Sequence, residues 1–409
     1  MLDSFRAKFI ILSIIVAISG FSQGMLLPLI AYVFEHRGID ASISGIHASG
    51  LYIGVFLSAL FIEVPLRKYG YRKLIVSGGL IVSLALLAFP ILDGIIFWFI
   101  LRLIVGVADN ALHFSTQTWL TDTTPRHKLG RVIAFYGLFF SAGFMIGPKV
   151  SELVEIAEPL PFIVSGALTM LAWPLIFLLK GAKDEKPSDN GVPISFISTL
   201  VNFKNVLKSS WVVFLFPLMF GVLEGSLHTN FPVYGLREGL EYADITWILP
   251  AFSFGAILFQ IPIGALGDKI GRPILVSILL LLGGSVFILL EFVESSLPMY
   301  MVLFALAGAF LGSMYSLGIT YMTDITPRFN LPAGNLMAGI FFSVGSISGP
   351  VLGGALIDAS NGTSYFIFFS VIVVILFICN VLFIWRRKIL SEEFKERMDR
   401  EHESSTHNY

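Results

Sequence analysis

Long apolar stretches dominate the pattern of this chain, and few polar positions interrupt each of them. A helix needs roughly 20 apolar residues to cross the ~30 Å hydrocarbon core of a bilayer, and these stretches are about that long. Because the bilayer core holds no water to pair backbone N–H and C=O groups, the runs predict helices and not strands. The twelve runs lie at about 9–33, 44–66, 73–92, 95–119, 131–155, 160–180, 210–234, 245–266, 273–292, 298–322, 332–357 and 364–386.

The chain contains an internal repeat. The hexapeptide TDTTPR at 121–126 returns as TDITPR at 323–328, and the match extends without a gap over 118–148 and 320–350, where 14 of 31 positions are identical. Such a register identifies two homologous halves. We therefore expect an all-α polytopic membrane protein with twelve transmembrane helices in two parallel six-helix repeats. The expected parts are an N-terminal half at 1–180, a cytoplasmic linker at 181–208, a C-terminal half at 209–386 and a cytoplasmic tail at 387–409.

Composition and charge agree with a membrane protein. Charged residues make up 13% of the chain and hydrophobic residues 56%, whereas soluble domains carry about 25% charged residues. Lys and Arg gather in alternate loops, which places both termini in the cytoplasm of a cell-membrane protein. The opposite loops are acidic, either because basic residues are excluded there or because they attract cationic substrates. The single cysteine, Cys379, allows neither an intramolecular disulfide nor a cysteine-based metal site.

One loop carries a family motif. The segment GALGDKIGRPILV (Gly264–Val276) resembles the G-x-x-x-D-[RK]-x-G-R signature of the major facilitator superfamily, whose transporters also consist of two parallel six-helix repeats. The resemblance implies the major facilitator fold and a gate on the cytoplasmic side. In the first half the corresponding segment has Glu63 and Arg67 at signature positions, one helical turn apart, where they can pair.

By the same resemblance, two charge clusters form this gate. The second-half cluster consists of Asp268, Lys269, Arg272, Asp324 and Arg328. The first-half cluster consists of Asp122, Arg126, Arg72 and Lys73. The alternative is that these are loop charges that only maintain the topology.

The fourth run carries a polar stripe. The segment RLIVGVADN (Arg102–Asn110) resembles a superfamily pattern associated with proton coupling. Helical spacing places Arg102, Asp109 and His113 on one face with Gly106 and Gln117, and the repeat partner keeps the glycine but lacks the ionisable groups and the glutamine. Ionisable residues inside a membrane are costly and mark functional sites by default. Two explanations remain open: a self-satisfied Arg102–Asp109 pair, or a water-filled path.

The seventh run places Glu224 near the middle of the membrane and His228 one turn away. In the superfamily, runs 1, 4, 7 and 10 line a central cavity. The resemblance therefore implies that Glu224 and Asp109 carry the proton, with His113 and His228 as relays and Arg102 beside them. The expected substrate-cavity residues are Gln23, Asn110, Asn230 and Tyr315.

A glycine motif also occurs twice. GFMIGP (Gly143–Pro148) resembles the core of a motif of superfamily antiporters, and GSISGP (Gly345–Pro350) repeats it. Either the motif marks an exporter, or its glycines simply let two helices approach closely. Lys149 and Glu152, three residues apart near the outer end, are expected to pair.

The sequence contains few features of other functional classes. There is no phosphate-binding P-loop, H-E-x-x-H motif or nucleophile elbow, so we expect neither an enzyme nor a cofactor, and no nucleic-acid partner. The tail is expected to be solvated and partly disordered, or to form a short surface helix. A receptor on a transporter scaffold would need a larger signalling segment.

The whole chain most resembles bacterial members of the superfamily in the YcaD-like branch. The resulting hypothesis is a monomeric proton-coupled secondary transporter, an exporter (antiporter) of small organic or amphipathic molecules. A proton-driven uptake symporter, a lipid translocator and a transporter-like receptor are the alternatives.

Overall fold

The computed structural model describes residues 5–179, 196–293, 296–326, 330–360, 362 and 365–406, and its described elements are helices. In chain order they are α1 (Phe5–His36), α2 (Ala41–Phe61), α3 (Glu63–Tyr69), α4 (Tyr71–Ala88), α5 (Ile95–Thr123), α6 (Arg126–Ser151), the 3-10 helix η1 (Glu152–Glu155), α7 (Leu160–Ala172), the 3-10 helix η2 (Trp173–Leu178), α8 (Phe196–Arg237), α9 (Tyr242–Ile270), α10 (Arg272–Leu290), α11 (Leu297–Leu311), α12 (Met314–Ile325), α13 (Leu331–Ser360) and α14 (Tyr365–Thr406).

Twelve helical segments in the described part of the chain are long and apolar enough to cross a membrane, which confirms the expected fold class. The tenth segment consists of α11 and α12, which are separated at Gly312 and Ser313. Helix α8 includes a non-helical residue, Ser210, and its membrane-spanning part begins there. The portion of α8 before Ser210 falls within the expected linker.

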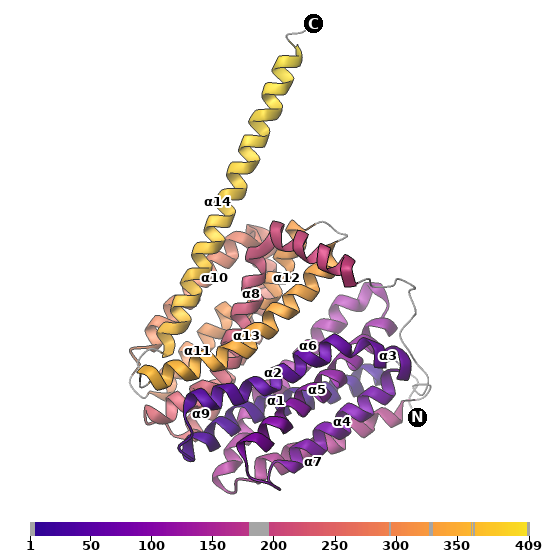
Figure 1. The fold of residues 1–409 in the computed structure, drawn as a ribbon, viewed down its shortest axis with the longest axis vertical. Coiled ribbons are helices and arrows are strands. Elements are labelled where there is room, and N and C mark those ends of the chain that lie inside the picture. The colour runs from indigo at the N-terminus through magenta and orange to yellow at the C-terminus, as the bar shows by residue number, and fades with distance from the viewer. Residues whose placement is uncertain are drawn as a thin grey trace.

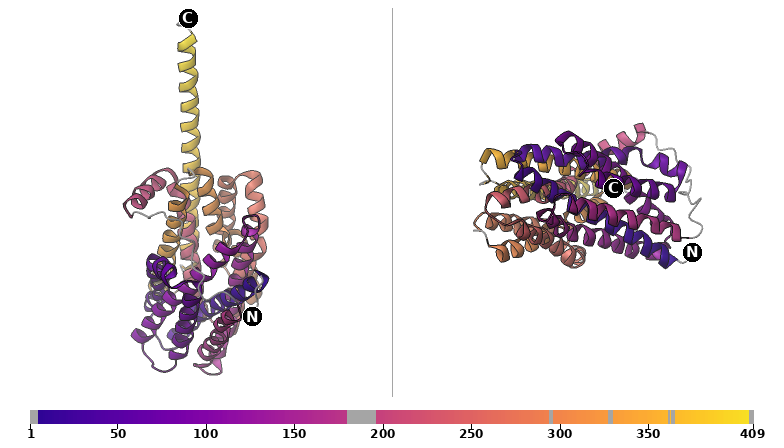
Figure 2. Two further views of the ribbon diagram at one scale, coloured as in Figure 1. Left: turned by 90° about the vertical axis from the view of Figure 1, so that its right-hand side faces the viewer. Right: turned by 90° about the horizontal axis from the view of Figure 1, so that it is seen from below.

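Helix α14 continues to Thr406, so the segment expected as the tail includes a helical extension of the last span. Its last part projects beyond the other helices (Figure 2). The sequence after Arg387 is rich in Glu, Lys and Arg and contains neither Gly nor Pro up to Thr406. Those residue types lose little freedom in a helix, so nothing in the local sequence ends α14 at the membrane boundary.

Local sequence explains where several helices end. Gly70 and Gly271 occupy corresponding turns of the two halves with φ of +82° and +88°, a backbone conformation that glycine adopts without strain. The repeated TPR motif ends α5 and α12, because a residue before proline is disfavoured in helical conformation. Thr124 and Thr326 accordingly have extended backbones directly after these helices.

The repeated glycine motif brings helices into backbone contact in both halves. A Cβ atom on Gly143 would lie 1.9 Å from the carbonyl oxygen of Ala17, so α6 packs tightly on α1. A Cβ atom on Gly345 would lie 2.0 Å from the carbonyl oxygen of Leu218, so α13 packs in the same way on α8. Both copies therefore serve helix packing, which supports that explanation of the motif.

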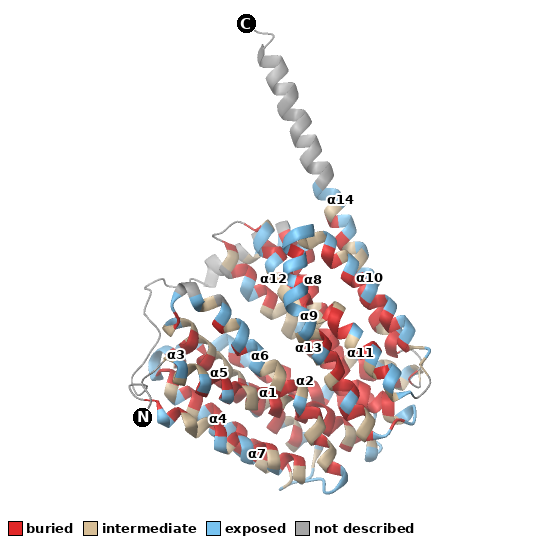
Figure 3. Ribbon diagram, turned by 180° about the vertical axis from the view of Figure 1, so that it is seen from behind, coloured by how far each residue is buried: buried red, intermediate tan, exposed pale blue. Residues whose placement is uncertain are grey.

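The helices of the two halves converge near α9 and diverge in the opposite direction (Figure 1). We call the end at which α2 and α9 begin the closed end, and the end at which α4 and α10 begin the basic end. At the closed end α2 and α13 are in backbone contact, since a Cβ atom on Gly45 would lie 2.1 Å from the carbonyl oxygen of Pro350. Buried residues concentrate inside the bundle, whereas exposed positions follow its outward faces (Figure 3).

Candidate functional site

A cavity of about 230 Å³ lies between the two halves of the chain. It contains three of the predicted site residues, Glu224, His228 and Tyr315. Its remaining walls are Phe140, Ser141, Phe144, Phe220, Phe252, Ser253, Ala256, Ile257, Gln260, Gly312 and Ser316, from α6, α8, α9 and the α11–α12 junction.

Two of the four expected runs, 7 and 10, line the cavity, and the other walls come from runs that were not expected there. Runs 5 and 8, which form α6 and α9, supply walls, whereas the residues given for this cavity include none from α1 or α5. The sequence analysis therefore missed Phe140 and Phe144 on α6, and Ser253 and Gln260 on α9. The last two were detectable, because they are polar residues seven positions apart, on one face of an apolar helix.

Glu224 lies on the cavity side of α8. The glycines on either side of it, Gly221 and Gly225, pack against α13, so the side chain of Glu224 occupies another face. The structure gives its carboxylate no hydrogen bond or ion pair among the described residues, and Tyr315 lines the same cavity. A carboxylate without a partner inside a membrane protein is costly to keep charged.

His228 follows Glu224 by one turn and is 2% exposed. Its ring meets the ring of Phe144 edge-on, with centroids 4.7 Å apart, and this contact joins α8 to α6 across the halves. The Nδ1 atom of His228 is buried and has no hydrogen-bond partner. The cavity therefore holds two unsatisfied polar groups one helical turn apart.

Asp109 belongs to a separate polar centre in the first half. Its carboxylate accepts a hydrogen bond of 2.7 Å from the Ser19 hydroxyl and another from the Gln23 amide, both on α1. The structure thus brings together two predicted residues, Asp109 and Gln23. The His113 ring packs edge-on against Tyr136 and Phe140, and Phe140 is a wall of the cavity.

Arg102 does not pair with Asp109, so the self-satisfied pair considered above is wrong. Its guanidinium lies 3.2 Å from His47 Nδ1 and donates to the backbone carbonyl of Leu26 at 3.1 Å. Seven residues span about 10.5 Å along a helix, so two groups on one face of α5 can meet different partners at different levels of the bundle. The sequence analysis missed His47, although a histidine within an apolar run was the same signal that selected His113.

Three of the four predicted cavity residues lie elsewhere: Gln23, which binds Asp109, and also Asn230 and Asn110. Asn230 is fully buried and donates from its amide to Ser226 Oγ at 2.9 Å and to the Pro350 carbonyl at 3.0 Å. It therefore fixes the packing of α8 on α13 and does not line this cavity. Asn110 is half-buried on α5 and is also absent from the cavity walls.

At the basic end, three members of the predicted second-half cluster contact one another. Arg272 donates to Asp268 at 2.6 Å and to Asp324 at 2.5 Å, and Lys269 is exposed nearby in sequence. This cluster joins α9, α10 and α12 within the same half. Arg328 lies outside the described residues.

The first-half cluster differs from the prediction. Asp122 accepts a hydrogen bond from the Tyr71 hydroxyl, while the guanidinium of Arg72 lies 4.7 Å from the ring centre of Phe177. No ion pair joins Asp122 to Arg72 in the described structure, because each has another partner. Glu63 pairs with Arg67 at 2.7 Å, as the sequence indicated. The side chain of Arg126 is not among those described.

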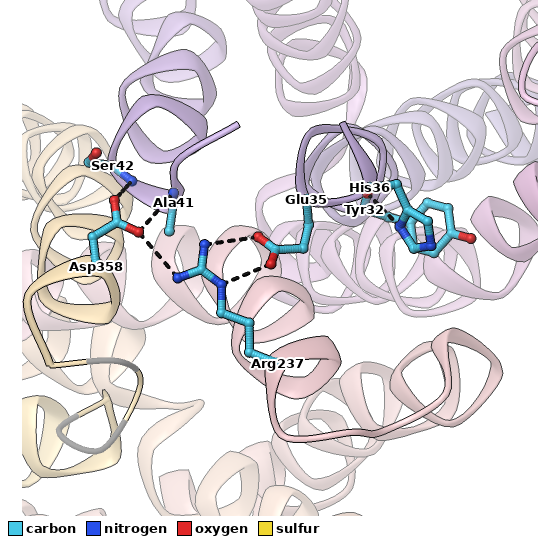
Figure 4. A network of polar contacts seen from close by, with 7 residues as sticks. All are labelled: Tyr32, Glu35, His36, Ala41, Ser42, Arg237 and Asp358. Atoms are coloured by element: carbon cyan, nitrogen blue, oxygen red, sulfur yellow. Dashed lines mark hydrogen bonds and ion pairs between the residues drawn. The ribbon is translucent and has the colours of Figure 1, made fainter. Parts of the chain in front are cut away.

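The closed end carries an ion pair and backbone hydrogen bonds between the halves (Figure 4). Arg237 on α8 donates to Glu35 on α1 and to Asp358 on α13. Asp358 in turn accepts from the backbone N–H groups of Ala41 and Ser42, at the start of α2. These contacts hold α1 and α2 of one half against α8 and α13 of the other.

A second connection lies between α6 and α9. Lys149 pairs with Glu152, which confirms the expected pair, and Thr246 donates to Glu152 at 3.0 Å. Ser151 and Tyr242 join their hydroxyls at 2.6 Å. The hydrogen bonds and ion pairs between the halves described here all lie at the closed end, so this conformation is shut on that side.

Comparisons with known proteins define the class. The family model described as Major Facilitator Superfamily matches residues 12–249 and 239–406. The chain is similar to the MFS-type transporter YfkF of Bacillus subtilis (strain 168), with 45% identity over 369 residues that cover 89% of this chain and 92% of the relative. Two bundles of six helices with a cavity between them are the architecture of secondary transporters. The chain belongs to the Major Facilitator Superfamily, and it is a transporter rather than an enzyme.

More distant relatives agree with this assignment. Multidrug resistance protein 2 of Bacillus subtilis (strain 168) is 22% identical over 367 residues, covering 86% of this chain and 89% of that protein. YcaD of Salmonella arizonae is 22% identical over 310 residues, covering 75% and 77%. The crystal structure of the nucleoside transporter NupG has a TM-score of 0.74 at 15% identity, over 92% of this chain and 99% of that one, and therefore supports the fold alone.

Proposed function

We propose that this chain is a proton-coupled secondary active transporter that exports small organic or amphipathic molecules through the cell membrane. The observation that carries the proposal is the unpartnered carboxylate of Glu224 on the wall of the cavity between the halves. Such a group can be neutralised by a proton or by a bound cation. A residue that alternates between the two links movement of the proton to movement of the substrate.

The contacts of each residue support a ranking of the proposed proton-coupling residues. Glu224 is the principal carrier, since its carboxylate has no protein partner in the described structure. Asp109 is the secondary carrier, because Ser19 and Gln23 already satisfy its oxygens. His228 serves as a proton relay for Glu224, and His113 serves as a relay for Asp109. Arg102 is the remaining ionisable residue of this group on α5.

The walls of the cavity suggest the chemistry of the substrate. Four phenylalanine rings and Tyr315 surround a single carboxylate, and the walls given for the cavity include no Lys or Arg. Aromatic faces attract cations and bury apolar surface at the same time. A substrate with an apolar body and one positive charge fits these walls. The similarity to a protein named for multidrug resistance supports export of such compounds.

The two halves, 1–180 and 209–386, would act as the moving bodies, joined by the 181–208 linker and followed by the 387–409 tail. With the basic end in the cytoplasm, as Lys and Arg distribution favours, the present conformation is shut toward the outside. Substrate would enter from the cytoplasm and leave after the closed end opens. The cytoplasmic gate would consist of Asp268, Lys269, Arg272, Asp122, Arg126, Asp324 and Arg328. The transporter would work as a monomer.

The test uses purified protein in proteoliposomes with a pH gradient. Tetraphenylphosphonium is the cationic probe, and a neutral triphenyl compound of similar size is the control. We expect the cation to release protons from the protein and to move against its gradient when protons flow the other way. Movement of the probe in the same direction as the protons would establish uptake instead, and movement that is insensitive to pH would overturn proton coupling.

A further inference from the structure

A second concave site lies on the outer surface of the bundle, away from the cavity. It is an apolar groove of about 540 Å³ between α6 of the first half and α9 and α11 of the second. Trp247, Phe254 and Val302 line it with more than half of each residue exposed. In a membrane-spanning bundle, apolar side chains exposed on the outer face of these helices contact lipid chains.

One end of the groove is polar. Lys149 is the charged residue of its lining, and the Lys149 ammonium lies 4.6 Å from the ring centre of Trp247. Lys149 pairs with Glu152, and their side chains keep 33% and 29% exposure. Trp247 lies near the start of α9, where tryptophan favours the level of lipid headgroups. The groove thus has an apolar body and a headgroup-level end.

The charges at this end complement a zwitterion. Lys149 presents one positive group and Glu152 one negative group, so the pair has no net charge to attract an anionic lipid. A phospholipid headgroup with a phosphate and an ammonium offers the two opposite charges. Its phosphate would face Lys149 and its ammonium would face Glu152, while one acyl chain fills the groove.

The groove also depends on the relative position of the two halves. Its walls belong to both halves at the closed end, so separating α6 from α9 would remove it. A ligand that binds only one of two conformations shifts the equilibrium toward that conformation. We propose that the groove binds a zwitterionic bilayer phospholipid through one acyl chain, with its headgroup at Lys149 and Glu152, and that bound lipid stabilises the state in which this end is closed.

The first test counts bound lipid. Protein is delipidated, incubated with phosphatidylethanolamine or phosphatidylglycerol, and analysed by native mass spectrometry. Ala305→Phe fills the groove, Ala305→Leu fills it more gently, and Ala265→Phe places the same ring on an exposed position of α9 outside it. We expect the parent and Ala265→Phe to retain one phosphatidylethanolamine that both Ala305 variants lose. Equal retention by all variants, or preference for phosphatidylglycerol, would overturn the proposal.

The second test measures the closed end directly. Spin labels are placed at the exposed positions Ile156 and Glu241, on opposite halves, after Cys379 is replaced by serine. Phosphatidylethanolamine should increase the short-distance population in the parent and in Ala265→Phe, and should leave it unchanged in Ala305→Phe. A dimer that Ala305→Phe dissociates would show that a second copy of the chain occupies the groove, and would also overturn the proposal. Neither readout depends on transport or on protons.

Discussion

Arg237 holds both carboxylate oxygens of Glu35, with Nε 2.8 Å from Oε1 and Nη2 3.1 Å from Oε2, across the boundary between the halves. Parallel donation from a planar guanidinium fixes orientation as well as distance. The same guanidinium reaches Asp358, which caps the start of α2. One residue therefore connects four helices at the closed end.

The first prediction concerns this connection. Arg237→Ala should favour the state that is open at the closed end, because it removes the ion pair with Glu35, which exists only while the halves touch. Partly exposed pairs contribute up to about 1 kcal/mol each, and 1 kcal/mol corresponds to roughly a fivefold change in population. The measurement is the rate at which an impermeant maleimide, added on the closed side, labels a cysteine at Ser253 in the cavity wall, with Cys379 replaced by serine.

Arg37 supplies the matched control. It lies at the same end with the same side-chain exposure, 30%, but its partners Asp93 and Glu158 belong to its own half. Arg37→Ala should therefore leave the labelling rate near that of the parent. If both variants accelerate labelling equally, the effect comes from loss of surface charge and not from the connection between the halves.

The second prediction concerns the repeated glycines. Gly143→Ala and Gly345→Ala should lower the melting temperature, since the added methyl group would meet a backbone oxygen and force two helices apart. Overpacking of this kind costs about 1–3 kcal/mol. Gly137 and Gly339, on the same two helices, have open space around a Cβ atom. Their alanine variants should be neutral or slightly stabilised, because alanine is the better helix former. Equal melting of all four variants would contradict the packing role.

The sequence predicts features that depend on neighbouring residues along the chain. Apolar runs define the spans, glycine permits the turn at Gly271, and proline ends α5 after Thr123. Helical spacing also shows which face carries Asp109. It does not show which helix that face meets, because the partners Ser19 and Gln23 are more than 80 residues away. The phenylalanines in the cavity wall cannot be distinguished by polarity from the other residues of an apolar helix. The shape of the cavity therefore could not be predicted from the sequence.

The third prediction concerns the gate at the basic end. Asp268→Asn should strongly reduce transport while expression remains near normal, since it removes one of the two carboxylates that Arg272 holds. Arg67→Gln should matter less, because Arg67 pairs with Glu63 on the same short helix. Vesicle transport, normalised to the amount of protein, measures both. Equal activity of Asp268→Asn and the parent would remove Asp268 from the gate.

The fourth prediction concerns Arg102, whose buried guanidinium has no carboxylate partner among the described residues. Arg102→Met should preserve the melting temperature or raise it, because replacing a buried charge with an apolar side chain of similar volume is often neutral or stabilising. Arg102→Ala should lower it, since it leaves an unfilled space beside α1 and α2. The measurement is the melting temperature of both variants and of the parent protein. If Met and Ala lower the melting temperature equally, the hydrogen bonds of Arg102 to His47 and to the Leu26 carbonyl offset the cost of burying its charge.

The last prediction separates the two candidate proton carriers. Glu224→Gln should abolish pH-driven movement of the substrate against its gradient, while exchange down the substrate's own gradient persists, because exchange needs no net cycle of protonation. Asp109→Asn should have the smaller effect, since the asparagine oxygen can still accept from Ser19 or Gln23. Substrate-induced proton release from purified protein and counterflow in proteoliposomes measure the two activities separately. Glutamine keeps the size of Glu224, so loss of counterflow as well would indicate a binding role for the carboxylate. Full proton release and full pH-driven transport in the double variant would show that neither carboxylate carries the proton.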